Sequence, residues 1–125
     1  MAEPLGILLI SGGHERAHYA LVVAAGAAAM GRLVCVFATN EGCRALLADR
    51  AGLDDAGRDA AVMARGVAGL DELLGAADEL GVRLMACDAG LAMAGIAAGA
   101  LRPGVEVAGV PTFLAAVAGG PIVTL

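Results

Sequence analysis

Cys87 is the side chain of this sequence best placed for covalent chemistry. It follows the apolar run 82–86, which predicts a buried strand, and it precedes a segment of helical character. A thiol at the start of a helix faces unpaired backbone N–H groups, which stabilise its thiolate form. Asp88 acts in the opposite sense, because a neighbouring carboxylate disfavours a thiolate. Cys87 is therefore a candidate nucleophile, and a small packing residue is the alternative interpretation.

The sequence gives less indication of a reactive role for the two other cysteines. Cys43 falls in the first turns of a short predicted helix beside Arg44, where it is either a second reactive thiol or a packing residue. Cys35 lies within the apolar run 33–38, which favours a place in the core. The wide gaps between the cysteines and the lack of a Cys-x-x-Cys pair give no zinc-site pattern.

His14 and His18 are four residues apart at the start of a predicted helix and therefore share one of its faces. With Glu15 they match part of a His-Glu-x-x-His metal motif, but no third ligand is evident and the sequence has no other histidine. This disfavours a metal site. We expect His14 to be either a proton donor or thiolate partner at the rim of the site, or an exposed residue at the start of the helix.

The loop 11–13 (Ser-Gly-Gly) after the first apolar run could cradle a phosphate at the start of the next helix. The sequence has neither a Gly-x-Gly-x-x-Gly motif nor a P-loop, and it contains no lysine. None of its three aromatic residues stands in an expected strand-end loop, as flavin stacking would require. We therefore expect no cofactor and no metal.

Alternating strands and helices must position these residues. Short apolar runs predict strands at 5–11, 33–38, 82–86, 105–108 and 122–125. Helical spacing and stop signals predict helices at 15–30, 40–48 (capped by Thr39 or Asn40), 70–80, 88–100 and 112–118. Between residues 49 and 66, where four aspartates and three arginines gather, we expect a solvated loop or mobile helix of unassigned role.

Strands joined through helices imply a parallel sheet covered by helices on both faces, with ligands at the carboxyl ends of the strands. The loops 11–15, 39–43 and 87–90 should meet at that edge. The candidate rim residues around Cys87 are Gly12, Gly13, His14, Asn40, Glu41, Cys43, Asp88 and Gly90.

Composition sets the class of protein. The length of 125 residues predicts a single domain over 1–125, and a net charge of −5 argues against a nucleic-acid partner. The hydrophobic share of 59% against 17% charged residues excludes disorder and favours a homo-oligomer that covers apolar surface. Prolines and a glycine pair interrupt the uncharged stretch 107–125, so we expect no membrane span. No export signal is apparent, which predicts a cytoplasmic protein with free thiols.

A succession of segments covers nearly the whole chain in a recognisable order. They are residues 11–13, 24–31, 36–39, 82–87, 93–96, 104–110 and 112–114. In this order they resemble the DsrE/DsrF-like family, whose members have the YchN-like fold. The resemblance implies a three-layer α/β/α subunit with a mostly parallel sheet of about five strands, assembled into trimers or hexamers.

The resemblance also implies a role for Cys87. In sulfur-relay members of the family, the matching cysteine carries sulfur as a persulfide between donor and acceptor proteins. Gly90 and Ala94 depart from the family pattern, which often has a small polar residue and a methionine at these positions. The interpretation is a sulfur carrier or sulfurtransferase, and the alternative is a non-catalytic oligomer that binds a small ligand or a partner.

Overall fold

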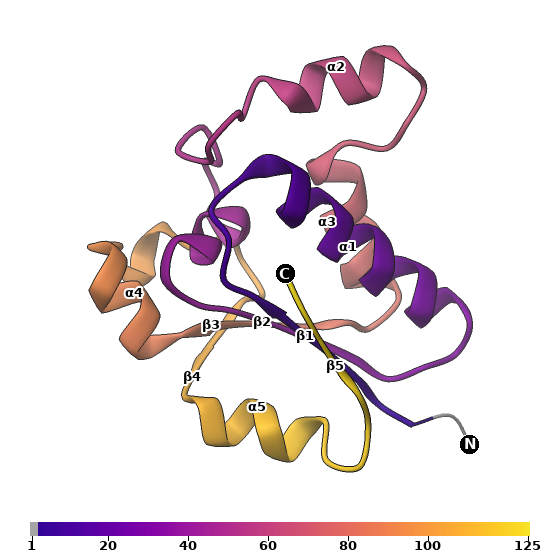
Figure 1. The fold of residues 1–125 in the computed structure, drawn as a ribbon, viewed down its shortest axis with the longest axis vertical. Helices are drawn as coiled ribbons and strands as arrows, with labels where there is room; N and C mark the ends of the chain where they lie inside the picture. The colour runs from indigo at the N-terminus through magenta and orange to yellow at the C-terminus, as the bar shows by residue number, and fades with distance from the viewer. Residues whose placement is uncertain (1–2) are drawn as a thin grey trace.

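The core of the protein is one five-stranded sheet with the strand order β4-β3-β2-β1-β5, in which every neighbouring pair is parallel (Figure 1). It is seen in a computed structural model that describes residues 3–125. The strands are β1 (Leu5–Leu9), β2 (Val34–Ala38), β3 (Arg83–Cys87), β4 (Glu106–Ala108) and β5 (Ile122–Thr124). The three central strands are almost wholly buried, whereas β4 and β5 are short and largely exposed edges.

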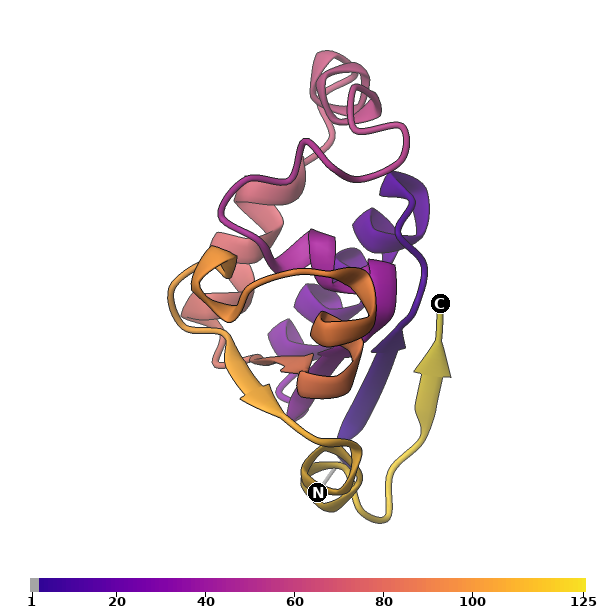
Figure 2. The same cartoon turned by 90° about the vertical axis from the view of Figure 1, so that its left-hand side faces the viewer.

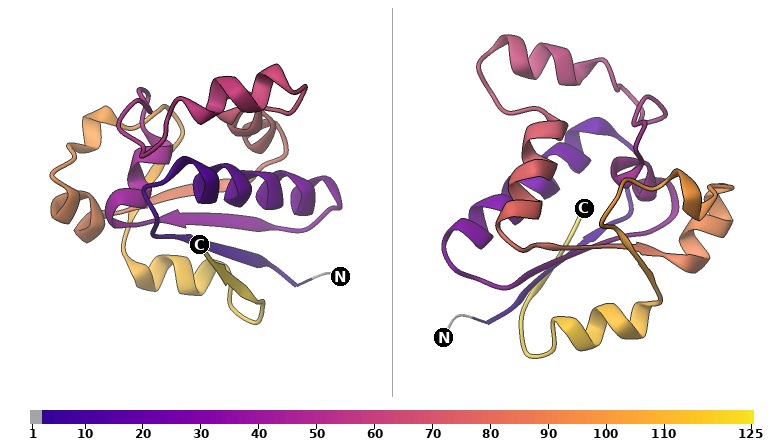
Figure 3. Two further views of the ribbon diagram at one scale, coloured as in Figure 1. Left: turned by 45° about the horizontal axis from the view of Figure 1, so that its top comes forward. Right: turned by 180° about the vertical axis from the view of Figure 1, so that it is seen from behind.

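Helices cover both faces of the sheet. The helical segments are α1 (His14–Ala29), η1 (Asn40–Leu46), α2 (Arg58–Ala64), α3 (Leu70–Glu79), α4 (Asp88–Ala94), η2 (Ala98–Ala100) and α5 (Val110–Ala116). Helices α1 and α3 pack side by side on one face, and α5 lies on the other (Figures 1 and 2). Helix α2 projects beyond α1 and α3, away from the sheet (Figure 3). The protein thus has the predicted three-layer α/β/α architecture.

Alternate residues of the strands feed two separate apolar clusters, as the period of two in a strand requires. On β2, Val36 and Ala38 join the larger cluster, which includes residues of α1 and α3. Cys35 and Phe37 join a smaller cluster with Phe113 of α5, whose ring stacks on that of Phe37 with centroids 4.9 Å apart. The core predicted from the apolar runs is therefore present, but one face is covered much more thinly than the other.

Two expected helices and one weakly patterned segment differ from the observed structure. Residues 40–46 form a 3-10 helix after Thr39, whose side chain makes no capping hydrogen bond. The expected helix 88–100 ends at Ala94, because Gly95 adopts φ 69° and closes α4 with a left-handed residue. The weakly patterned segment 49–66 contains the regular helix α2. Across residues 3–125, no helix combines the length and apolarity needed to cross a membrane.

Candidate strand-end cysteine site

The three loops expected to converge at the carboxyl edge of the sheet lie against one another. The Gly42 amide, after β2, donates to the Ile10 carbonyl, after β1, over 3.0 Å. A Cβ atom at Gly12 would lie 2.6 Å from the Cβ of Glu41, so these loops touch through a glycine. The loops that carry Gly12, Asn40 and Glu41 therefore meet at this edge of the sheet.

Gly90 brings the third loop into the same contact. A Cβ atom there would lie 2.3 Å from the Thr39 hydroxyl oxygen and 2.5 Å from the Asn40 amide nitrogen. Asn40 takes φ 51°, a left-handed turn by which the chain leaves β2. Because a Cβ atom at position 90 would overlap Thr39 and Asn40, the first turn of α4 packs directly against the end of β2.

Cys87 ends β3 and is the N-cap residue of α4. Its Sγ accepts a hydrogen bond from the Gly90 amide over 3.4 Å. The residue is only 5% exposed and packs in the smaller cluster with Phe37, Met85 and Phe113. The sulfur therefore lies among apolar side chains, with one backbone N–H donor directed at it.

The neighbouring carboxylate has a partner of its own. Asp88 is exposed, and its Oδ1 accepts the Ala89 amide over 2.7 Å. The negative charge therefore lies on an N–H group of the first turn of α4, where it is favoured.

Cys43 is buried on the opposite face of the sheet, in the larger cluster. Its thiol donates to the Ala38 carbonyl over 3.5 Å. Burial raises the pKa of Cys43 to about 11, against the lowering effect of the Cys87 backbone N–H. Burial likewise raises the pKa of Cys35 to about 11, partly offset by the charge of Arg83. Both residues are protonated packing residues at neutral pH.

His14 is not at the rim, contrary to both expectations for it. It is fully buried, and its Nε2 lies 2.7 Å from Oδ1 of Asp59. Arg58 approaches Nδ1 to 3.3 Å. Because arginine can only donate, Nδ1 must accept and Nε2 must carry the proton given to Asp59. With both ring nitrogens engaged, His14 is not a partner of the Cys87 thiolate.

The second histidine also has an internal partner. The ring of His18 stacks on that of His14 with centroids 5.4 Å apart, and its Nε2 bonds the Ala68 carbonyl over 2.8 Å. Within residues 3–125, no cluster of three or more His, Cys, Asp or Glu side chains is placed to hold a metal ion. The histidine pair instead joins α1 to the segment before α3.

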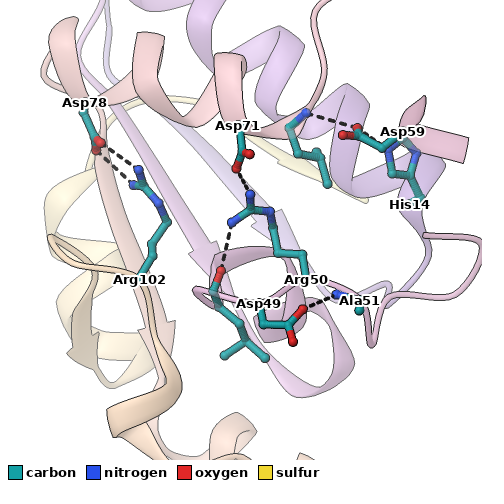
Figure 4. Close-up of polar contacts among 10 residues, drawn as sticks. His14, Asp49, Arg50, Ala51, Asp59, Asp71, Asp78 and Arg102 are labelled. Carbon is teal, nitrogen blue, oxygen red and sulfur yellow. Dashed lines mark hydrogen bonds and ion pairs between the residues drawn. The ribbon is translucent and has the colours of Figure 1, made fainter. Parts of the chain in front are cut away.

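Asp59 and its surroundings are a feature that the spacing of the sequence did not reveal. The Asp59 carboxylate lies between the His14 ring and the Leu70 amide (Figure 4). Burial acts to raise the pKa of Asp59, but these two hydrogen bonds, together with the electrostatic influence of His14 and His18, hold the pKa below its usual value. His14, Arg50, Asp59 and Leu70 also line a cavity of about 360 Å³. The only available signal was the gathering of acids and arginines between residues 49 and 66.

A family model matches residues 5–123 of the chain, described as the DsrE/DsrF-like family. The chain belongs to the DsrE/DsrF-like family. The match includes Cys87 and all three loops around it. No curated protein matches the sequence significantly.

Two solved structures share the fold of this family member at low sequence identity. The ychN protein from E. coli has a TM-score of 0.74 and 15% identity, over 99% of this chain and 100% of that one. MTH1491 from Methanobacterium thermoautotrophicum, described as a protein of unknown function, has a TM-score of 0.66 and 17% identity over the same shares. These likenesses show a YchN-like fold, as the sequence predicted.

Replacing Gly90 tests the contact that holds the site. We expect Gly90→Ala to lower the free energy of unfolding by about 1–3 kcal/mol, because its Cβ overlaps the end of β2. The matched control is Gly75→Ala in α3, where the added Cβ meets open space and helix propensity predicts a gain of up to about 1 kcal/mol. Urea unfolding of both variants measures this. Equal stability of the two would show that the close contact is absent.

Proposed function

We propose that this protein is a sulfur carrier in which Cys87 holds a sulfane sulfur as a persulfide. The Cys87 thiolate attacks the outer sulfur of a donor persulfide. A sulfur–sulfur bond forms at Cys87 as the donor's own sulfur–sulfur bond breaks, and the donor leaves as a thiolate. Attack by an acceptor thiolate on the same outer sulfur then restores Cys87. Both steps exchange one sulfur–sulfur bond for another, so no external oxidant or reductant is required.

The hydrogen bond from the Gly90 amide to the Cys87 sulfur is the observation that carries this proposal. A backbone donor held by a rigid contact stabilises an anionic sulfur without the need of a histidine or lysine. Membership of the DsrE/DsrF-like family supports it, since the family is associated with sulfur relay. The proposal keeps the cytoplasmic location expected from the sequence, because three free thiols suit a reducing compartment.

The low exposure of Cys87 favours a second candidate function. A residue 5% exposed among Phe37, Met85 and Phe113 has the surroundings of a packing side chain. In that case the protein is a non-catalytic oligomer that binds a small ligand or a partner at the same edge of the sheet. The two functions differ in whether the Cys87 thiol reacts while the protein stays folded.

We also propose that copies of this chain cover the thin face of the sheet and its β4 edge. Met93 of α4 is 80% exposed, Leu114 of α5 is 49% exposed, and Val107 and Val110 beside them are similarly open to solvent. These apolar side chains lie on the elements that flank Cys87. A soluble monomer rarely exposes a group of neighbouring large apolar side chains, which supports the expected trimer or hexamer. Sulfur donor and acceptor proteins would then approach an assembled rim.

Incubation with a persulfide donor tests the sulfur-carrier function. The intact protein is expected to gain the mass of one sulfur, the Cys87→Ser variant to gain none, and Cys43→Ser to behave as the parent. Cys43 is the matched control because it is a second cysteine at the same end of the sheet with a pKa raised by burial. Mass spectrometry after alkylation measures the gain. The absence of any gain in the parent protein rejects the carrier function.

Light scattering tests the assembly. The parent protein is expected to have the mass of a trimer or hexamer, and Leu114→Arg to shift the population to monomers, because it places a charge in the buried face. The control is Ala61→Arg at an exposed residue of α2, which should leave the mass of the assembly unchanged. A monomeric parent protein would contradict the proposal.

A further inference from the structure

We propose that residues 55–68, the α2 arm, form a hinged segment that is latched onto the body of the protein by the Asp59 carboxylate. The arm is the projecting segment that carries α2 (Figure 3). Its residues Ala56, Gly57 and Asp59 line one side of the open cavity of about 360 Å³ that His14, Arg50 and Leu70 also line. The proposal is independent of the sulfur chemistry at Cys87.

The α2 arm buries little of its apolar surface. None of residues 55–68 is buried, and α2 contributes no residue to either apolar cluster core. Only Ala56 and Ala68, near its two ends, pack partly against the larger cluster. Segments with so little apolar burial open at a small fraction of the free energy of global unfolding. The helix is therefore held in place mainly by polar contacts.

Those polar contacts converge on α1 and on the start of α3. The Asp59 Oδ1 atom accepts from His14 Nε2 over 2.7 Å and from the Leu70 amide over 3.1 Å (Figure 4). Arg58 adds a bond to His14 Nδ1 and a weaker ion pair of 3.4 Å with exposed Glu15. Hydrogen bonds to a charged group are the stronger ones, so Asp59 is the principal attachment of α2.

Both ends of the arm are fixed to the body, which defines where it bends. Before it, Leu53 is buried and Asp54 exchanges backbone hydrogen bonds with the loop after β1. After it, Leu70 begins α3 and is buried. Asp55, at one end, has φ 57°, and Gly66, near the other, has φ 78°. The arm therefore spans two anchored points, with left-handed turns close to each.

The polar groups around the cavity are paired with one another while the latch is made. Within residues 3–125, every buried side-chain nitrogen and oxygen has a hydrogen-bond partner. Arg50 at the cavity wall is itself engaged with the Leu47 carbonyl and with Asp71 (Figure 4). Release of Asp59 frees the His14 Nε2–H and Leu70 N–H groups, which share one carboxylate oxygen in the closed state. The latch thus determines whether these two buried donors are paired.

Hydrogen exchange of the whole protein measured by mass spectrometry tests the latch. Asp59→Ala is expected to raise amide exchange in peptides from residues 55–68 by about tenfold or more, since it removes a charged acceptor. Asp59→Asn keeps an acceptor oxygen and should give a smaller rise. Glu72→Ala is the matched control, because Glu72 is an exposed acid in the first turn of α3 and should leave the arm unchanged.

Trypsin cleavage after Arg65, an exposed residue of the arm, provides a second readout. Cleavage should be faster in Asp59→Ala than in the parent protein. Amide exchange in peptides from β1, β2 and β3 should stay as slow as in the parent protein. Exchange in the arm equal to that of the parent protein would overturn the latch. A rise of equal size in the central strands would also overturn it, because the arm would then open only with the whole domain.

Discussion

The close contact between the first turn of α4 and the end of β2 is the constraint on which the site depends. Gly90 lies against Thr39 and Asn40 with no room for a side chain. This contact fixes where α4 begins and therefore where the Gly90 amide points. The same amide donates to the Cys87 sulfur. The position of the sulfur and its one polar contact thus have a common origin in the packing of the start of α4 against the end of β2.

This arrangement separates three chemically identical residues by their surroundings. Cys35 and Cys43 have their pKa values raised to about 11 by burial, which keeps them as thiols. Cys87 is also buried, and it stands at the strand end, where its sulfur accepts a hydrogen bond from the Gly90 amide. The site contains no histidine or lysine partner for its sulfur, because His14 is engaged with Asp59 and Arg58. Any stabilisation of a negative charge on the Cys87 sulfur must therefore come from backbone N–H groups.

The strands and the location of Cys87 could be predicted because local pattern determines them. A buried parallel strand has a continuous apolar run, so β1, β2 and β3 were recognisable, and Cys87 directly follows such a run. The meeting of the loops followed from the parallel topology. The length of α4 was overestimated because small residues continue past Gly95, although a glycine at that place is also a usual helix end.

The surroundings of His14 could not be predicted from pattern. Its partner Asp59 is 45 residues away in the sequence and lies in a segment with no clear periodicity. Helix α2 has no apolar face turned to the core, so the usual signal for a helix was missing. Burial of a histidine at the start of α1 depends on tertiary hydrogen bonds that spacing does not record. The steric reason for Gly90 was hidden for the same reason, since it depends on Thr39 of another loop.

The rate at which Cys87 is alkylated in the folded protein tests the central claim most directly. It is measured in a Cys35→Ser, Cys43→Ser background and compared with the rate of global unfolding under the same conditions. A sulfur carrier must present its sulfur without unfolding, so we predict that alkylation outpaces unfolding many times over. Modification no faster than unfolding would show that Cys87 is a sealed packing residue and would contradict the account.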